Sequence, residues 1–114
     1  MPPIRTPMLT RIPVATKESL KALAANPEYG NLRKMFELLF DKFLSERPYK
    51  QSGFIWIQPD RKDTPGWIAF NVVVSDESQN KIKEESSRLE VSLTTLLYTA
   101  ILWWIEINKR ANRF

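Results

Sequence analysis

The segment of residues 66–108 constrains the fold of this chain most strongly, because it reads as one strand followed by two helices. Strand-favouring apolar residues run from 67 to 74 and end at the polar stop of residues 75–77. Two helical segments follow and are divided at residues 89–92. A short strand with two helices cannot bury its apolar faces alone. The segment therefore predicts a second, similar unit in the same chain.

The second helical segment of this unit is apolar around most of its circumference. Ser92 is a helix-capping residue type and suits the start of this helix. Ser75 or Asp76 suits the start of the preceding helix. That preceding helix carries only Ile82 and Leu89 inward. Such a broad apolar stripe predicts a helix at the centre of an assembly. Its apolar residues recur at spacings of three and four, and they are Leu93, Leu96, Leu97, Ala100, Ile101, Trp104 and Ile105, widened by Leu102, Trp103 and Ile107.

The first half of the chain carries a similar pattern. Residues 9–14 predict a strand with Ile12 and Val14 on its inner face. Thr16 is the expected cap of a short helix that ends at Pro27 and Gly30. The two second helices then align without gaps, pairing Asn31 with Ser92, Leu32 with Leu93, Met35 with Leu96, Phe36 with Leu97, Leu39 with Ala100, Phe40 with Ile101, and Phe43 with Trp104.

These patterns predict a mostly α chain with a short antiparallel β-ribbon. Two strand-helix-helix units would form a pseudo-dimer, one in residues 1–47 and one in residues 66–114, with a linker of residues 48–65. The alternative is a mixed α+β domain whose long helices share a period by chance.

The linker carries an additional strand pattern at residues 54–58, where aromatic and aliphatic residues alternate. We expect this segment to form a hairpin with residues 68–74. It would then either pair at the edge of the ribbon or keep the two repeat strands apart. Trp56 and Trp67 would be cross-strand partners, or an exposed aromatic patch for a protein partner.

Composition limits the chemistry available to the 114 residues, of which 43% are hydrophobic and none is Cys or His. Disulfides, Cys/His zinc sites, thiol nucleophiles and histidine catalysis are therefore absent. Asp60 and Asp63 lie in a turn-like loop, and three glycines form no phosphate-binding loop. We expect no enzyme activity, no catalytic residues, no metal and no cofactor.

The sequence also bears on where in the cell the protein is found. No apolar run approaches the roughly 20 residues of a membrane span, and the N-terminus lacks the apolar core of a signal peptide. We expect a cytoplasmic protein with no membrane partner.

The second half of the chain resembles the ribbon-helix-helix DNA-binding family of the Arc and MetJ type. The resemblance rests on FNVVVSDE at residues 70–77, on Ile82, and on LEVSLTTLL at residues 89–97, where Glu90 stands in place of the family's usual glycine. It covers residues 66–108 closely and residues 8–46 less closely. Two units in one chain resemble the tandem arrangement of TraY-type relaxosome accessory proteins.

The resemblance implies that one strand from each unit pairs into an antiparallel ribbon that enters the major groove. Outward strand residues would then read base edges: Arg11 and Pro13 in the first strand, and Ala69, Asn71 and Val73 in the second. Asn suits the adenine edge, Arg the guanine edge, and Val a thymine methyl group. The alternative is that Asn71 and Val73 are ordinary strand residues and Arg11 is a solvated charge.

The resemblance also implies phosphate contacts at the start of each second helix. These positions are Asn31 and Leu32 in the first unit and Ser92 and Leu93 in the second. Backbone N–H groups and the positive end of a helix favour a phosphate. The alternative is that Asn31 and Ser92 serve only as helix caps.

The leading hypothesis is a sequence-specific double-stranded DNA-binding protein, acting in repression or as an organiser of a DNA site for a machine such as a conjugative relaxase. The net charge of +4 favours an anionic partner. A protein partner at the DNA is expected, as is a homodimer or higher oligomer through Trp103 and Ile107. An antitoxin is a variant of this hypothesis. The alternative is a non-enzymatic protein-interaction and dimerisation module.

Overall fold

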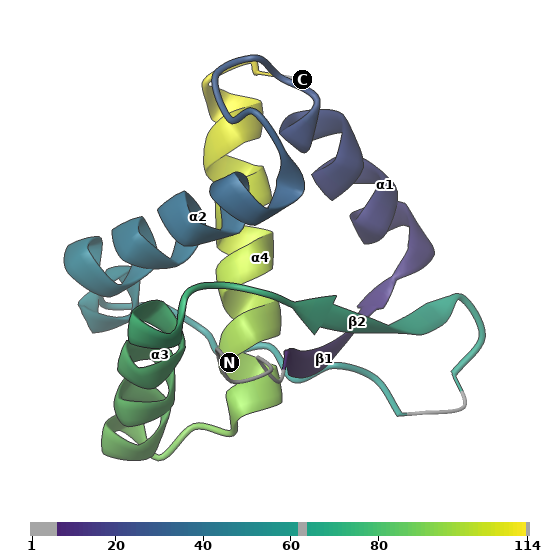
Figure 1. Cartoon of the computed structure of the whole chain (residues 1–114). Helices are drawn as coiled ribbons and strands as arrows, with labels where there is room; N and C mark the ends of the chain where they lie inside the picture. Colours follow the sequence, from purple (N-terminus) through teal and green to yellow (C-terminus); the bar gives the residue numbers. More distant parts are fainter. Residues whose placement is uncertain (1–6, 62–63, 114) are drawn as a thin grey trace, which may run out of the picture.

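The computed structural model describes residues 7–61 and 64–113 of the chain. The elements follow in the order β1 (Met8–Pro13), α1 (Val14–Ala24), α2 (Leu32–Glu46), a short 3-10 helix η1 (Pro48–Lys50), β2 (Trp67–Val72), α3 (Asp76–Leu89) and α4 (Leu93–Arg110), as Figure 1 shows. The described part is mostly helical and has one antiparallel sheet of two strands. The expected class, mostly α with a short antiparallel ribbon, is confirmed.

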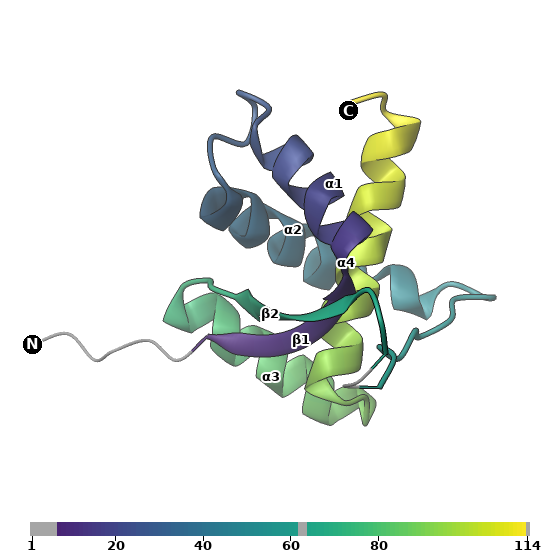
Figure 2. The same cartoon turned by 90° about the vertical axis from the view of Figure 1, so that its right-hand side faces the viewer.

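The ribbon joins the two halves of the chain, because β1 lies in the first half and β2 in the second. Figure 2 shows the two strands running side by side. The register pairs Leu9 with Asn71, Thr10 with Phe70, and Arg11 with Ala69. Side chains alternate between the two faces as a period of two requires, so that one face is buried and the other exposed. The buried face carries Met8, Thr10 and Ile12 from β1, and Phe70 and Val72 from β2.

The end of the first strand differs from the prediction. Val14 does not belong to the inner face of β1, since it opens α1 and its side chain is 45% exposed. Thr16 lies inside α1 and is not its cap. Pro13 explains both differences, because a proline has no N–H to continue the ladder and its φ of −64° suits the position before a helix. The N–H of Val14 instead donates to the carbonyl of Gly66 at 2.8 Å.

The predicted caps of the other three helices are confirmed. The side chain of Asn31 accepts a hydrogen bond from Lys34 N, Ser75 from Ser78 N, and Ser92 from Thr95 N. Between α3 and α4 the chain turns through Glu90, whose φ of 56° lies in the left-handed region. The turn thus keeps a conformation that glycine adopts readily, although a glutamate occupies it.

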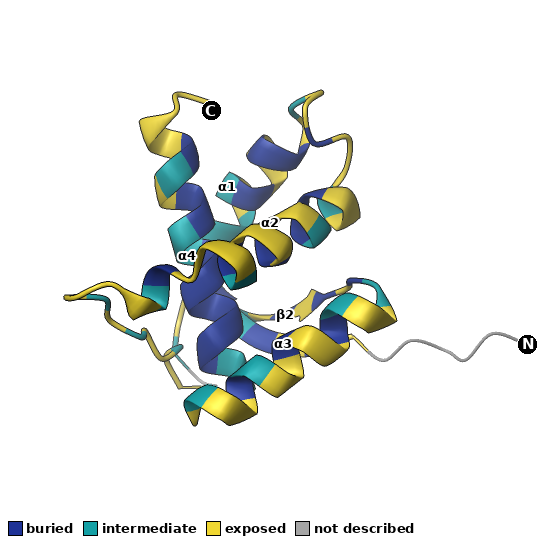
Figure 3. Ribbon diagram, turned by 90° about the vertical axis from the view of Figure 1, so that its left-hand side faces the viewer, coloured by how far each residue is buried: buried dark blue, intermediate teal, exposed yellow. Residues whose placement is uncertain are grey.

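The core is built around α4, as its broad apolar stripe predicts. Leu96, Leu97, Ala100 and Ile101 have no exposed surface. Figure 3 shows α4 buried along much of its length, whereas α2 and α3 present exposed outer faces. Phe36 of α2 also meets Phe70 of β2, with ring centroids 5.8 Å apart. Both halves of the chain therefore contribute to one core.

None of the described helices, taken singly, is long and apolar enough for a membrane span. Only α3 and α4 taken together would satisfy those two criteria, and they are bent by 108° where they meet.

Residues 54–58 form no hairpin with β2, so this prediction is wrong. Residues 54–60 are not strand, and the sheet in the described residues consists of β1 and β2 alone. The linker instead runs against α4, where the N–H of Ile57 donates to Thr99 Oγ1 at 2.9 Å. Trp56 and Trp67 are not cross-strand partners either. Trp56 stacks on Tyr49 at 5.5 Å between ring centroids, while Trp67 meets Tyr98 at 5.3 Å.

Candidate nucleic-acid interface

The outer face of the ribbon is the surface on which the predicted base-reading residues meet. Ala69, Asn71 and Val73 are exposed, and Arg11 and Pro13 are partly exposed. All five predicted positions therefore lie on the face that points away from the core. Together with Leu9, these residues form what we call the outer ribbon face.

Leu9 belongs to this face but was not among the predicted residues. Its side chain is 56% exposed and it pairs directly with Asn71 across the ribbon. The signal was present in the sequence, because Leu9 precedes Arg11 by two residues and a strand places such residues on the same face. The apolar character of Leu9 concealed it, since exposed leucines are not usually sought as contact residues.

Arg11 is held at one end of the ribbon by a contact with the linker. Its Nη2 donates to the carbonyl oxygen of Arg61 at 3.4 Å, at an exposed position. Hydrogen bonds of this length are weak and exchange readily with other acceptors. The contact links the guanidinium to the linker, while the backbone of Arg11 pairs with that of Ala69 across the ribbon. Pro13 lies beyond Arg11, next to Trp67, and contributes shape but no hydrogen-bond donor.

The start of α4 is anchored directly behind the ribbon. The hydroxyl of Thr10, on the buried face of β1, lies 2.9 Å from both the carbonyl oxygen and Oγ1 of Thr94. Ser92 is exposed and Leu93 partly exposed just ahead of this contact. The first turn of α4 contains no acidic residue, so the positive end of the helix is not neutralised locally.

The start of α2 is less closely attached to the ribbon. Asn31 is exposed and Leu32 partly exposed, and the first turn again lacks an acidic residue. Arg33 and Lys34 add positive charge there. The helix meets β2 further along, through Phe36 and Phe70. The start of α4 is thus held directly against the ribbon by a hydrogen bond. The helix α2 contacts the ribbon further along its length, through a pair of aromatic rings.

The start of α3 is different, because carboxylates already occupy it. Asp76 and Glu77 lie in its first turn. Glu37 of α2 also reaches it and accepts hydrogen bonds from the N–H of Ser75 and, at 2.7 Å, from the hydroxyl of Ser78. Burial favours the neutral acid, but the hydrogen bonds from Ser78 and Ser75 outweigh it and hold the pKa of Glu37 below its ordinary value. This helix start is a structural joint and is not open to a phosphate.

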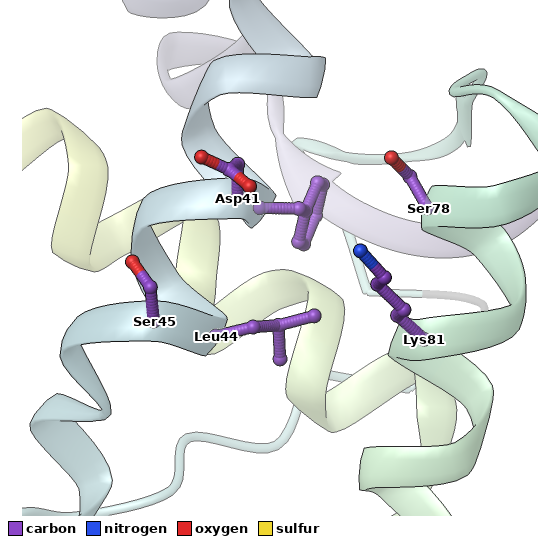
Figure 4. A pocket seen from close by; sticks show the side chains of 6 residues that line it. Asp41, Leu44, Ser45, Ser78 and Lys81 are labelled. Atoms are coloured by element: carbon purple, nitrogen blue, oxygen red, sulfur yellow. The ribbon is translucent and has the colours of Figure 1, made fainter.

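A hollow of about 220 Å³ lies between α2 and α3. Leu44 and Lys81 point into it from the two helices, as Figure 4 shows. Lys81 also pairs with Glu77 at 3.3 Å, and both side chains are largely exposed. No residue of the outer ribbon face lines the hollow. In the described residues there is also no group of three or more acidic side chains that could hold a metal ion. We assign no chemistry to this hollow.

A second surface, which we call the linker groove, lies between the linker and the outer side of α4. It has a volume of about 410 Å³. Ile55 and Ile57 stand at its edge with 72% and 42% of their surface exposed. Trp103 forms part of its wall and packs on Phe43 with ring centroids 5.4 Å apart. The groove is therefore lined mainly by apolar side chains, with Gln51, Glu106 and Arg110 among them, and its wall packs on the aromatic core.

No family model, curated protein or solved structure matches this chain. The assignment of function therefore rests on the geometry and chemistry of the chain's own residues.

Proposed function

We propose that the chain is a sequence-specific double-stranded DNA-binding protein in which two ribbon-helix-helix units form an intramolecular pseudo-dimer. The observation that carries the proposal is the register of the ribbon. It pairs one strand from each half of the chain and leaves Asn71, Arg11 and their exposed neighbours on the same outer face. The major groove admits a two-stranded ribbon, and both of these side-chain types form bidentate contacts with purine edges.

The helix starts and the net charge support the same function. The first turns of α2 and α4 carry no acidic residues, so their backbone N–H groups suit DNA phosphates. The whole chain has a net charge of +4. The biological role that we propose is repression of transcription or organisation of a DNA site for another machine, in the cytoplasm and without enzymatic activity.

The proposal is tested by selecting duplexes from a random-sequence library and measuring affinity against salt concentration. We expect specific sites to emerge, and log affinity to fall with log salt at a slope of about −0.9 for each phosphate neutralised. Asn71→Ala should weaken binding to the selected site by roughly 1–3 kcal/mol and leave binding to random DNA almost unchanged. Absence of binding at low salt would contradict the proposal.

A second candidate function is a protein-interaction or dimerisation module, and the linker groove favours it. Exposed apolar side chains that border a groove often mark a protein contact. Trp103 and Ile107, expected from the sequence to mediate self-association, both line this groove. Changing Ile55 and Ile57 together to Asp separates the two functions. The interaction-module hypothesis requires this variant to lose self-association or partner binding, whereas DNA binding through the ribbon should persist.

A further inference from the structure

The two ends of the outer ribbon face differ in chemistry. The Leu9–Asn71 pair lies on one side of the buried Thr10–Phe70 pair, and the Arg11–Ala69 pair lies on the other side. Val73 follows Asn71 by two residues and continues the first end on the same face. We call Leu9, Asn71 and Val73 the apolar end. The opposite end carries a cation beside a methyl group.

The apolar side chains of the apolar end are more exposed than their neighbours along the chain. Leu9 and Val73 are 56% and 37% exposed, whereas the adjacent Met8 and Val72 are almost completely buried. Directly opposed side chains on a ribbon are roughly 5 Å apart at Cβ, and their diagonal neighbours remain within reach of long side chains. A single amide is therefore flanked by two apolar groups on an exposed surface.

This combination fits one class of base pair. In the major groove, adenine offers an acceptor and a donor to an amide such as that of Asn71, and its partner thymine offers a methyl group to an apolar side chain. A G·C pair lacks that methyl, because cytosine carries only a hydrogen at C5, and it presents the cytosine N4 donor and the guanine O6 acceptor nearby. Leu9 and Val73 would cover these groups without offering a hydrogen bond, which is unfavourable.

We infer that the apolar end reads A·T base pairs, with Leu9 as a specificity-determining residue that packs on the C5-methyl group of a thymine. This inference rests on the proposed function and deepens it. Because the opposite end carries Arg11 and Ala69 instead, the DNA site read by one chain is directional: its A·T pairs lie at one end, and it is not itself a palindrome.

The test replaces each thymine of a selected duplex in turn by deoxyuridine, which removes only the methyl group. For the wild-type chain we expect a loss of about fourfold in affinity at each contacted methyl, as the burial of one methylene-sized group predicts. Leu9→Ala should bind the thymine site as weakly as the wild type binds the uracil site, and should no longer distinguish the two bases at that position. Leu38→Ala, which changes another exposed leucine on α2, should retain the full discrimination.

Three results would overturn the inference. The wild type could bind thymine and uracil sites equally, Leu9→Ala could retain discrimination at every position, or selection could return a palindrome within the site bound by a single chain. Each of these leaves DNA binding itself intact and so differs from failure of the proposed function, in which no duplex is bound at low salt. Because Leu9 is exposed, Leu9→Ala is expected to fold normally, and circular dichroism with thermal unfolding verifies this.

Discussion

At the scale of single residues, Glu90 shows how this chain departs from an ideal sequence without losing its fold. It ends α3 with φ 56° and ψ 38°, a left-handed conformation that costs a residue with a Cβ about 1–2 kcal/mol. The turn is nevertheless held, because Val91 N donates to Ser86 O at 3.1 Å and the hydroxyl of Ser86 donates to Val91 O. The surrounding hydrogen bonds therefore impose the conformation on the glutamate.

We therefore expect Glu90→Gly to stabilise the protein by about 0.5–1 kcal/mol. The substitution removes the left-handed penalty, and part of that gain is offset because glycine makes the unfolded chain more flexible. Urea unfolding measures the change. The matched control is Glu84→Gly at an exposed position inside α3, which should destabilise by about 1 kcal/mol. If both variants lost stability equally, the left-handed turn would not be under strain.

At the scale of elements, the sequence predicted local features better than it predicted partners. The alternation of residues 54–58 is present in the structure, since Phe54 and Trp56 are partly buried and Ile55 and Ile57 are exposed. The hairpin partner was wrong, because a period of two indicates an extended chain and does not specify what it pairs with. The linker instead packs on α4 and on the aromatic core, through a hydrogen bond from Ile57 to Thr99 and a ring contact between Trp56 and Phe43.

The joint between α2 and α3 could not be predicted from spacing, since Glu37 and Ser75 are far apart in the sequence. Caps formed within one segment, such as Ser92 on Thr95, were predictable because donor and acceptor lie three residues apart. A cap that reaches across from another helix depends on packing that no local pattern encodes. The outer ribbon face falls between these cases. Its β2 residues followed from alternation, and alternation also places Leu9 two residues before Arg11 on this face, where its apolar character concealed it.

Glu37 should make stability depend on acid pH. Its pKa is lowered in the folded state, since hydrogen bonds from Ser78 and Ser75 outweigh the effect of burial. Its contribution is therefore fully present above the ordinary pKa of 4.5 and is lost as pH falls through the folded-state pKa. We expect Glu37→Ala to cost roughly 1–3 kcal/mol at pH 7 and to reduce the loss of stability on acidification.

The measurement is urea unfolding of both proteins between pH 7 and pH 3. Glu18→Gln supplies the control, because this exposed carboxylate on α1 has no comparable role as a cap of another helix. An equal acid dependence in wild type and Glu37→Ala would show that the joint does not contribute through its charge.

At the scale of the whole molecule, the ribbon and α4 make the two halves dependent on each other. β1 has its only described strand partner in β2, and α4 packs its hydroxyl-bearing first turn on Thr10 of the first half. At its other end α4 binds the loop before α2, where Tyr29 donates to Asn108 Oδ1 at 2.5 Å. Because both strands belong to one chain, their pairing requires only closure of the intervening loop.

This arrangement predicts that Leu97→Asp unfolds the whole chain and not only its second half. Leu97 is completely buried in α4, and an unpaired carboxylate there costs several kcal/mol, on the order of the full stability of a small domain. Hydrogen exchange should therefore show loss of protection in α1 and α2 as well as in α3 and α4. Leu38→Asp is the matched control, since Leu38 is 36% exposed and its variant should keep native protection throughout. Slow exchange confined to α1 and α2 in Leu97→Asp would mean that the first half folds independently, because the core around α4 would then be dispensable for it.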